Sequence, residues 1–302
     1  MLLMLVVLAC GGAGDDSSDV VDTTIIDSSV DTNTTEPDPC YDFVEEIADC
    51  AQRVAPLETG AGEYYESIDE GSDTLHSDLS ALIDEHTTVS YDNLWSYFPY
   101  TDMREDGTVW DIYSTLDDGT APYYYQMIDD QCGEYSGEGF CYNREHVWPK
   151  SWFGGGSPMK SDLHHLYPTD GYVNSRRSSS PYGVVDHPIW TSQNGGLLGG
   201  SDQCGGGGMS VFEPADSFKG DLARVFFYIS VRYGLEDAGW DSSSAADGAN
   251  IEQWEEDLLR AWHIMDPVSE KEINRNEAVF VIQGNRNPFV DHPEWVCRIS
   301  DF

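Results

Sequence analysis

Residues 141–178 gather most of the polar chemistry of the chain into one short segment. Its candidate functional side chains are Glu145, His146, His164, His165 and Asn174, accompanied by the cations Arg144, Lys150, Lys160, Arg176 and Arg177. Successive residues of a regular strand point to opposite faces, so Glu145 and His146 can share one site only where the backbone bends. Pro149 favours a strand end close to this point. We therefore expect a strand end carrying Glu145 and His146, facing a helix that carries Asn174.

The distribution of charge marks the same segment as the place where a polyanion would bind. The formal net charge is −40, from 55 acids and 15 Lys and Arg, which argues against loose attraction of nucleic acid to the whole surface. Several of the 15 cations nevertheless fall between Arg144 and Arg177, where the acids are Glu145, Asp162 and Asp170. The segment is thus locally positive within an acidic protein. The alternative is that these cations pair with neighbouring acids.

The residue types in this segment suit hydrolysis of a phosphodiester bond, which needs an activated water and neutralisation of the phosphate charge. His146 is the candidate general base, because an imidazole titrates near neutral pH. The Glu145 carboxylate and the Asn174 amide oxygen suit Mg²⁺, which keeps several waters besides. Arg177 follows Asn174 by three positions, so both share one helix face, and its guanidinium can hold a phosphate by two parallel bonds. Thr169 is the expected N-cap of that helix.

A zinc site is the competing interpretation of the same cluster. It would use His146, His164 and His165, although two adjacent histidines on a regular backbone cannot both face one site. The chain contains no His-Glu-x-x-His sequence, so a metalloprotease is poorly supported. Magnesium and zinc remain open at this point.

The pattern of the whole chain predicts an α+β fold, rich in helix, with a small sheet. Apolar periodicity and capping signals predict helices at 42–49, 74–86, 221–233, 251–264 and 269–283. The last begins with a capping box at Ser269 and Glu272 and ends at Gly284. A strand is expected at 108–113, after an Asp-Gly turn. The glycine-rich segment 195–208 lacks either phosphate-binding glycine pattern and is predicted to be a surface loop.

The first residues predict export. The apolar run 1–9 is followed by Cys10 and two glycines, which resembles a bacterial lipoprotein cleavage site whose cysteine is lipidated. Residues 11–39 carry eight Asp or Glu and no Lys or Arg, as expected of a disordered, solvated tether. The predicted organisation is a leader at 1–10, an acidic tether at 11–39 and a globular domain at 40–302. The expected location is the cell envelope, periplasmic or extracellular, with membrane contact only through a lipid on Cys10.

Six further cysteines suit an oxidising compartment. They are Cys40, Cys50, Cys132, Cys141, Cys204 and Cys297. The sequence allows 15 pairings. We favour two local loops, Cys40–Cys50 and Cys132–Cys141, which leaves Cys204–Cys297. The chain has no Cys-x-x-Cys pair, so binding of metal by these thiols is disfavoured.

Three ordered motifs resemble the bacterial endonuclease I family of periplasmic and secreted nucleases. They span 143–154, 161–178 and 283–291, joined by Lys219-Gly-Asp-Leu-Ala-Arg224, and the likeness runs from about Leu75 to Val296. The resemblance implies a ββα-metal, or His-Me finger, site on a small antiparallel sheet. It also implies cleavage of DNA, and often RNA, with little sequence preference and with 5′-phosphate products.

By this resemblance His146 is the general base, while Glu145 and Asn174 hold Mg²⁺, for which Ca²⁺ or Mn²⁺ can substitute. The arginine that stabilises the cleaved phosphate comes in some members from an insertion that is short here, so Arg177 is the candidate substitute; a salt bridge that fixes the helix is its alternative role. Asp162 and His165 are expected to orient these groups. Candidate contacts to the nucleic-acid backbone are Arg144, Lys150, Arg176, Arg224 and Arg286, with structural roles as the alternative for Arg224 and Arg286.

Two other functions stay open on the sequence alone. One is a catalytically idle surface lipoprotein that uses the nuclease fold for binding, and the other is a zinc phosphoesterase. The intact set of Glu145, His146 and Asn174 argues against an idle protein. The expected molecule is a monomeric endonuclease whose partners are DNA and RNA substrates.

Overall fold

The computed structural model describes residues 50–202 and 208–302. The leader with Cys10, the acidic tether, the helix expected at 42–49, and the cysteines Cys40 and Cys204 lie outside the described residues. Within the described ranges, no helix is long and apolar enough to cross a membrane.

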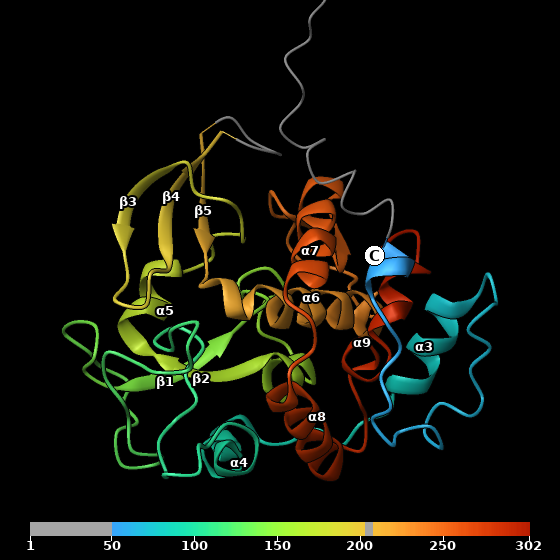
Figure 1. The fold of residues 1–302 in the computed structure, drawn as a ribbon, viewed down its shortest axis with the longest axis horizontal. Helices are drawn as coiled ribbons and strands as arrows, with labels where there is room; N and C mark the ends of the chain where they lie inside the picture. Colours follow the sequence, from blue (N-terminus) through green and yellow to red (C-terminus); the bar gives the residue numbers. More distant parts are fainter. Residues whose placement is uncertain (1–49, 203–207) are drawn as a thin grey trace, which may run out of the picture. The chain divides into compact units, whose positions relative to one another are not determined.

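The described residues form an α+β fold, as predicted (Figure 1). The helices are α2 (Cys50–Arg53), α3 (Leu75–Ile83), α4 (Leu94–Thr101), α5 (Gly171–Arg177), α6 (Lys219–Tyr233), α7 (Gln253–Met265), α8 (Glu270–Gln283) and α9 (Pro288–Asp291). The strands are β1 (Tyr142–His146), β2 (Leu166–Asp170), β3 (His187–Thr191), β4 (Leu197–Ser201), β5 (Met209–Glu213), β6 (Ala246–Asp247) and β7 (Asn250–Ile251). They make three small antiparallel sheets, β1–β2, β3–β4–β5 and β6–β7.

Helix α6 runs through the middle of the core (Figure 1). It packs against α7, α3 and α9. The predicted apolar stripe of this helix is buried, but so is every other residue of α6. The charged side chains on its polar face are accommodated by ion pairs: Arg224 with Glu272 and Arg232 with Asp84. A helix surrounded on all sides explains why periodicity predicted its position and understated its burial.

Local capping signals set the bounds of α8 as the sequence predicts. The Ser269 hydroxyl accepts a hydrogen bond from the Glu272 backbone N–H at 3.2 Å, and the Glu272 carboxylate accepts one from the Ser269 backbone N–H at 2.9 Å. Gly284 ends the helix with φ +86°, a conformation that glycine adopts without a steric penalty.

The strand expected at 108–113 is absent from the described residues, and only isolated bridges form there. Asp111 interrupts the extended run, because its carboxylate accepts hydrogen bonds from the Tyr113 and Asp170 backbone N–H groups, both at 2.8 Å. The Asp111 carbonyl oxygen then accepts from Thr115 N–H at 3.0 Å and closes a turn. The segment therefore forms a turn bonded to β2 and not a strand.

The glycine-rich segment is not a continuous loop, since residues 197–201 form β4, the central strand of its sheet. Gly199 lies against the backbone of β3, where an added Cβ would collide with the carbonyl oxygen of His187. Glycine here permits close approach of two strands. The prediction failed because the same composition is typical of flexible loops.

The disulfide prediction is correct for one pair. Cys132 and Cys141 are bonded, but Cys50 is bonded to Cys297, so the expected pairs Cys40–Cys50 and Cys204–Cys297 are wrong. The Cys50 and Cys297 Cα atoms lie 5.6 Å apart although 247 positions separate them in sequence. Helix α2 packs against the C-terminal segment 293–297, a contact that the sequence pattern does not reveal.

Candidate active site

Two antiparallel strands followed directly by a helix bring the candidate residues together. Strand β1 ends at His146, and in the register with β2 Glu145 lies opposite Tyr167 and His146 opposite Leu166. Strand β2 leads without a loop into α5, which carries Asn174. The strand end and the helix expected from the sequence are thus present. The bend expected between Glu145 and His146 is not, because both residues lie within β1 in unbroken register with β2 and their side chains have different partners.

Helix α5 is capped by Asp170, not by Thr169 as expected. The Asp170 carboxylate accepts a hydrogen bond from the Val173 backbone N–H at 2.8 Å, and its second oxygen accepts from the Tyr125 hydroxyl and the Gly139 N–H. Thr169 remains in the strand, paired with Asn143. The helix therefore starts one position later, because β2 continues to Asp170.

The His146 ring is fixed in one orientation. Its Nε2 lies 3.0 Å from the Lys160 carbonyl oxygen, which can only accept, so Nε2 carries the proton and Nδ1 carries the lone pair. The ring stacks on Tyr91 with centroids 5.8 Å apart and lies 5.4 Å from the His165 ring. Only 8% of His146 is exposed.

Burial is the main reason that the pKa of His146 is lowered to about 3, with smaller contributions from the nearby His165, Lys150 and Arg144 charges. The hydrogen bond to Lys160 acts in the opposite direction. An imidazole with a lowered pKa is neutral at pH 7 and has a lone pair available to accept a proton.

Glu145 and Arg177 form a buried ion pair. The Arg177 Nη1 lies 2.7 Å from Glu145 Oε1, and the same oxygen accepts from the Tyr113 hydroxyl at 2.8 Å. Burial raises the pKa of the Glu145 carboxyl, and the Arg177 guanidinium and the Tyr113 hydroxyl oppose that shift. Both contacts engage Oε1 alone.

Arg177, expected to face the phosphate, is instead completely buried. Besides Glu145, its guanidinium donates to the carbonyl oxygens of His146, Val147 and Ser180 at 3.1, 2.8 and 3.1 Å. All of these partners are internal. The helix-fixing alternative therefore describes Arg177, because a guanidinium enclosed by the end of β1 and the turn after α5 has no face left for a substrate.

The Asn174 amide is oriented by β1. Its Nδ2 donates to the Arg144 carbonyl oxygen at 3.1 Å, which ties α5 to the residue before Glu145. The Asn174 Oδ1 accepts no hydrogen bond from any of the described residues, so this oxygen remains available as an acceptor. Asn174 is only partly buried, so Oδ1 belongs to a group that a ligand can reach.

The donor set fits a hard, hydrated cation better than zinc. One carboxylate and one amide oxygen are the kind of protein ligands that Mg²⁺ uses while it keeps several waters. Zinc requires a fuller set of nitrogen or sulfur ligands. Among the described residues, no group of three or more His, Cys, Asp or Glu side chains is placed to hold a metal. His164 points elsewhere, with its Nε2 3.1 Å from the Asn285 carbonyl oxygen and its ring against Tyr228.

Asp162 and His165 fix the position of the loop that precedes β2. Asp162 accepts hydrogen bonds from the hydroxyls of Tyr228 and Tyr233 at 2.7 and 2.9 Å and from the Gln283 amide at 2.9 Å. His165 holds the Met159 carbonyl oxygen at 2.7 Å, and its own carbonyl accepts from Val147 N–H. These bonds tie the loop before β2 to α6, α8 and the end of β1.

Comparison with known proteins decides the family. A family model described as Endonuclease I matches residues 71–294. The extracellular ribonuclease of Bacillus subtilis (strain 168) is 32% identical over 245 residues, which cover 78% of this chain and 77% of that protein. The chain belongs to the endonuclease I family.

Two further relatives are similar to this chain. The extracellular ribonuclease of Bacillus amyloliquefaciens is 32% identical over 244 residues, covering 78% of this chain and 77% of that protein. A periplasmic deoxyribonuclease of Aeromonas hydrophila is 28% identical over 136 residues, covering 44% of this chain and 48% of that protein. The family expected from the three motifs is confirmed, and the protein is an endonuclease.

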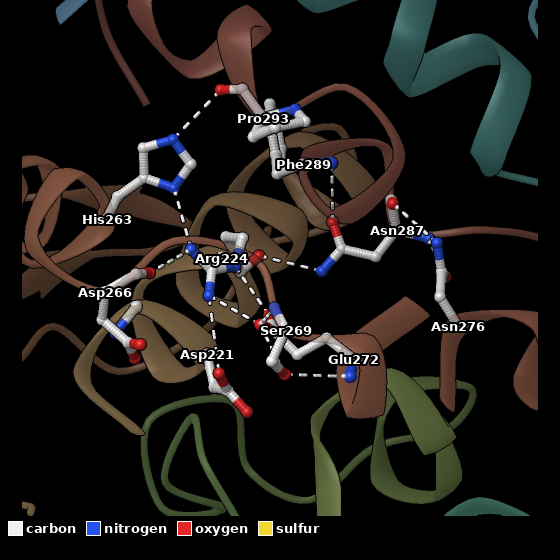
Figure 2. A network of polar contacts seen from close by, with 11 residues as sticks. Asp221, Arg224, His263, Asp266, Ser269, Glu272, Asn276, Asn287, Phe289 and Pro293 are labelled. Atoms are coloured by element: carbon white, nitrogen blue, oxygen red, sulfur yellow. Dashed lines mark hydrogen bonds and ion pairs between the residues drawn. The ribbon is translucent and has the colours of Figure 1, made fainter. Parts of the chain in front are cut away.

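Arg224 of this endonuclease, a candidate backbone contact, lies inside the protein (Figure 2). Its guanidinium binds Glu272 through two contacts of 2.6 and 2.8 Å, and it also donates to the Asp266 carbonyl oxygen at 2.9 Å. Its backbone carbonyl accepts from the Asn287 amide at 3.0 Å. Removal from solvent assigns Arg224 the structural role, joining α6 to α8 and to the turn before α9.

Arg286 has the same kind of role. It pairs with Asp291 through contacts of 2.7 and 3.1 Å and with Glu277 at 2.7 Å. The neighbouring Asn287 caps α9. The segment 285–287 is therefore a structured turn, and the buried guanidinium is unavailable to a nucleic-acid backbone.

Four cations of the segment 144–177 have no acidic partner among the described residues. Carboxylates pair with Arg177, Lys219, Arg224, Arg232, Arg260, Lys271, Arg275, Arg286 and Arg298. Arg104, outside the segment, binds the Gly119 carbonyl oxygen and the Thr115 hydroxyl instead. Arg144, Lys150, Lys160 and Arg176 form no ion pair with a described carboxylate. The locally positive segment expected from the sequence thus remains largely uncompensated, with Arg177 as the exception.

Sequence reasoning missed Tyr91 and Tyr113 as parts of the site, and it named Lys160 only for its charge. Tyr113 binds Glu145, Tyr91 stacks on His146, and Lys160 supplies the carbonyl oxygen that orients that ring. Tyr91 and Tyr113 lie in segments remote from the motifs and read as ordinary core aromatics. Lys160 was expected as one of the cations of residues 144–177, whereas the contact of its carbonyl oxygen with His146 is visible only in the tertiary structure.

Proposed function

We propose that this endonuclease is metal-dependent and has little sequence preference, cleaving DNA and RNA to products with 5′-phosphates. The observation that carries the proposal is the buried, neutral His146 ring, oriented by the Lys160 carbonyl oxygen, next to Glu145 and close to the β1-anchored Asn174. A neutral base, a carboxylate and an amide oxygen are the groups that metal-assisted phosphodiester hydrolysis requires.

In the proposed reaction, His146 Nδ1 accepts a proton from the attacking water. The hydrogen bond from Nε2–H to Lys160 holds the ring in the required tautomer and spreads the positive charge that forms on it. Water attacks the phosphorus, the bond to the 3′-oxygen breaks, and that oxygen takes a proton from solvent water and leaves as a 3′-hydroxyl. The phosphate stays on the 5′ side. Arg177 acts as a positioning residue by holding Glu145 through Oε1.

Glu145, through its second oxygen, and Asn174 Oδ1 would hold Mg²⁺, or Ca²⁺ or Mn²⁺ in its place. When bound, the ion would polarise the phosphate and neutralise charge on the leaving oxygen. Asp162 and His165 keep the loop and the strand end in place around these ligands.

The substrate proposal rests on chemistry and on relatives. Arg144, Lys150 and Arg176 are cations without described acidic partners, which suits contact with phosphates rather than with base edges. Relatives with names printed as ribonuclease and as deoxyribonuclease support action on both nucleic acids.

Cleavage of supercoiled plasmid tests the proposal. We expect purified protein to nick and then degrade plasmid and single-stranded RNA with Mg²⁺ and to stop with EDTA. Early nicks should be sealed by DNA ligase without prior treatment with a kinase, since they carry 5′-phosphates. Folded protein that cleaves neither substrate with Mg²⁺, Mn²⁺, Ca²⁺ or Zn²⁺ would favour the binding-only alternative, and cleavage with Zn²⁺ alone would favour the zinc phosphoesterase.

We also propose that the protein is exported with residues 1–10 as a leader, is lipidated on Cys10 and carries residues 11–39 as a tether to a nuclease domain at 40–302. Relatives named extracellular and periplasmic support export. In cells that produce the full chain, the protein should partition into the detergent phase of a Triton X-114 extract. The Cys10→Ser variant should appear in the aqueous phase; equal partitioning of both would contradict lipidation.

A further inference from the structure

Three functional groups, from Arg144, His146 and Lys160, pack against the ring of Tyr91. The Arg144 Cζ lies 3.9 Å from the centre of this ring, and the Lys160 Nζ lies 4.8 Å from it. The His146 ring is stacked on Tyr91, with an angle of 19° between the planes and 5.8 Å between the centroids. One partly exposed aromatic side chain thus gathers two cations beside the proposed base.

Each of these groups is held in place by more than the ring. Tyr91 opens a 3-10 turn, Tyr91–Asn93, that leads into α4. Arg144 Nη1 donates to the Tyr91 carbonyl oxygen at 2.9 Å, and its Cζ also lies 4.6 Å from the Trp95 ring. The Lys160 carbonyl oxygen is the partner of His146 Nε2. The backbone around Lys160 therefore orients the base while its side chain brings a charge to the same place.

No carboxylate among residues 50–202 and 208–302 compensates the charge of Arg144 or of Lys160. Neither side chain forms an ion pair with a described carboxylate, although the chain has 55 acids and 15 Lys and Arg. Two cations on one aromatic ring repel each other, and the ring's electron-rich face offsets only part of that repulsion. An anion between them would be attracted by both. A phosphodiester is the anion that this endonuclease must bind next to His146.

We propose that Tyr91 is a positioning residue that holds Arg144 and Lys160 beside His146 as the two cations that bind the scissile phosphate. This inference rests on the proposed function and names the groups that bind the phosphate of the nucleic-acid substrate. The Arg144 guanidinium already donates to the Tyr91 carbonyl oxygen through Nη1, and its Nε is buried, so Nη2 is the group left to donate to a phosphate oxygen. The Lys160 ammonium supplies a second charge. Both neutralise the charge that grows on the phosphate oxygens during attack. They take the part first expected of Arg177.

A purely structural role is the alternative. Arg144 and Tyr91 would then only fasten the 3-10 turn to β1. Replacement would lower the melting temperature and leave the salt dependence of binding unchanged. A phosphate-binding role predicts the opposite for Lys160, whose side chain is partly exposed and whose backbone bond to His146 survives substitution.

The test compares Arg144→Ala, Lys160→Ala, Tyr91→Leu and Tyr91→Phe with the control Arg298→Ala. Arg298 pairs with Glu70 and carries the same charge. The measurements are kcat and KM on a fluorescent oligonucleotide with Mg²⁺, the salt dependence of KM, and the melting temperature. We expect kcat/KM to fall at least about tenfold for each lost cation, with kcat reduced as well. The slope of log affinity against log salt should shrink by about 0.7–0.9 for each lost cation.

Tyr91→Leu should lower kcat/KM without reducing the net positive charge, and Tyr91→Phe, which keeps the ring, should stay within about twofold of the wild type. Arg298→Ala should match the wild type. Wild-type kcat/KM and salt slope in both Arg144→Ala and Lys160→Ala would overturn the inference, even if the melting temperature fell. If Arg144→Ala does not fold, wild-type kcat/KM in Lys160→Ala and in Tyr91→Leu would overturn the inference, with Tyr91→Phe as the control that keeps the ring. A wild type inert towards nucleic acid would instead overturn the proposed function itself.

Discussion

Replacing His146 with alanine should reduce the rate of plasmid nicking by about 10²–10⁴-fold, the contribution typical of a general base. The ring is neutral at pH 7 because burial lowers its pKa to about 3, and its Nε2–H is already bound to the Lys160 carbonyl oxygen. Alanine removes the group that accepts the proton from water. The measurement is kcat with Mg²⁺ at saturating plasmid.

His164→Asn is a matched control for that experiment. His164 is the next buried histidine, but its ring faces Tyr228 and Asn285, away from the strand end. Its loss should lower the melting temperature while the folded protein keeps wild-type kcat. Cleavage by His146→Ala at the wild-type rate would contradict the assignment of the base. Equal loss of activity in both variants, in proportion to unfolding, would point to stability alone.

Replacing Arg177 with methionine should lower the free energy of unfolding by about 3–5 kcal/mol. The substitution leaves the Glu145 carboxylate buried without its charged partner, which is the costly way to break a buried pair. It also removes donors from three carbonyl oxygens. Urea denaturation followed by tryptophan fluorescence measures the effect.

A double-mutant cycle separates the pair from its surroundings. Glu145→Gln combined with Arg177→Met removes both charges, so the loss in the double variant should be smaller than the sum of the two single losses by about 1–3 kcal/mol. The double variant should remain inactive, because the proposed metal ligand is gone. Additive losses within about 0.5 kcal/mol would show that Glu145 and Arg177 do not act as a pair.

Much of this site could be predicted because its signals are local. The end of β1 at His146 and the helix that carries Asn174 follow from short-range patterns around Pro149 and 169–177. The capping box at Ser269 and Glu272 likewise fixed the start of α8 from adjacent residues. Such signals depend on spacing along the chain, which the sequence contains directly.

The failures share a different cause, since each depends on residues far apart in the chain. Asp111 forms a turn because its carboxylate binds the backbone of Asp170, and Cys50 finds Cys297 through packing of the two ends of the domain. Arg177 has the right spacing from Asn174 to share one helix face with it, yet it forms an ion pair with the buried Glu145. Spacing shows what a side chain can reach; only the tertiary structure shows which partner it binds.

The most direct test of the proposed site is the Mg²⁺ dependence of plasmid cleavage by the wild type and by Asn174→Ala. Asn174 touches the rest of the site through one hydrogen bond to the Arg144 carbonyl oxygen, so alanine should leave the fold intact. If Glu145 and Asn174 hold the ion, the Mg²⁺ concentration for half-maximal rate should rise at least about tenfold in Asn174→Ala. An unchanged Mg²⁺ midpoint, or equal rates with Mg²⁺ and with EDTA, would contradict the account.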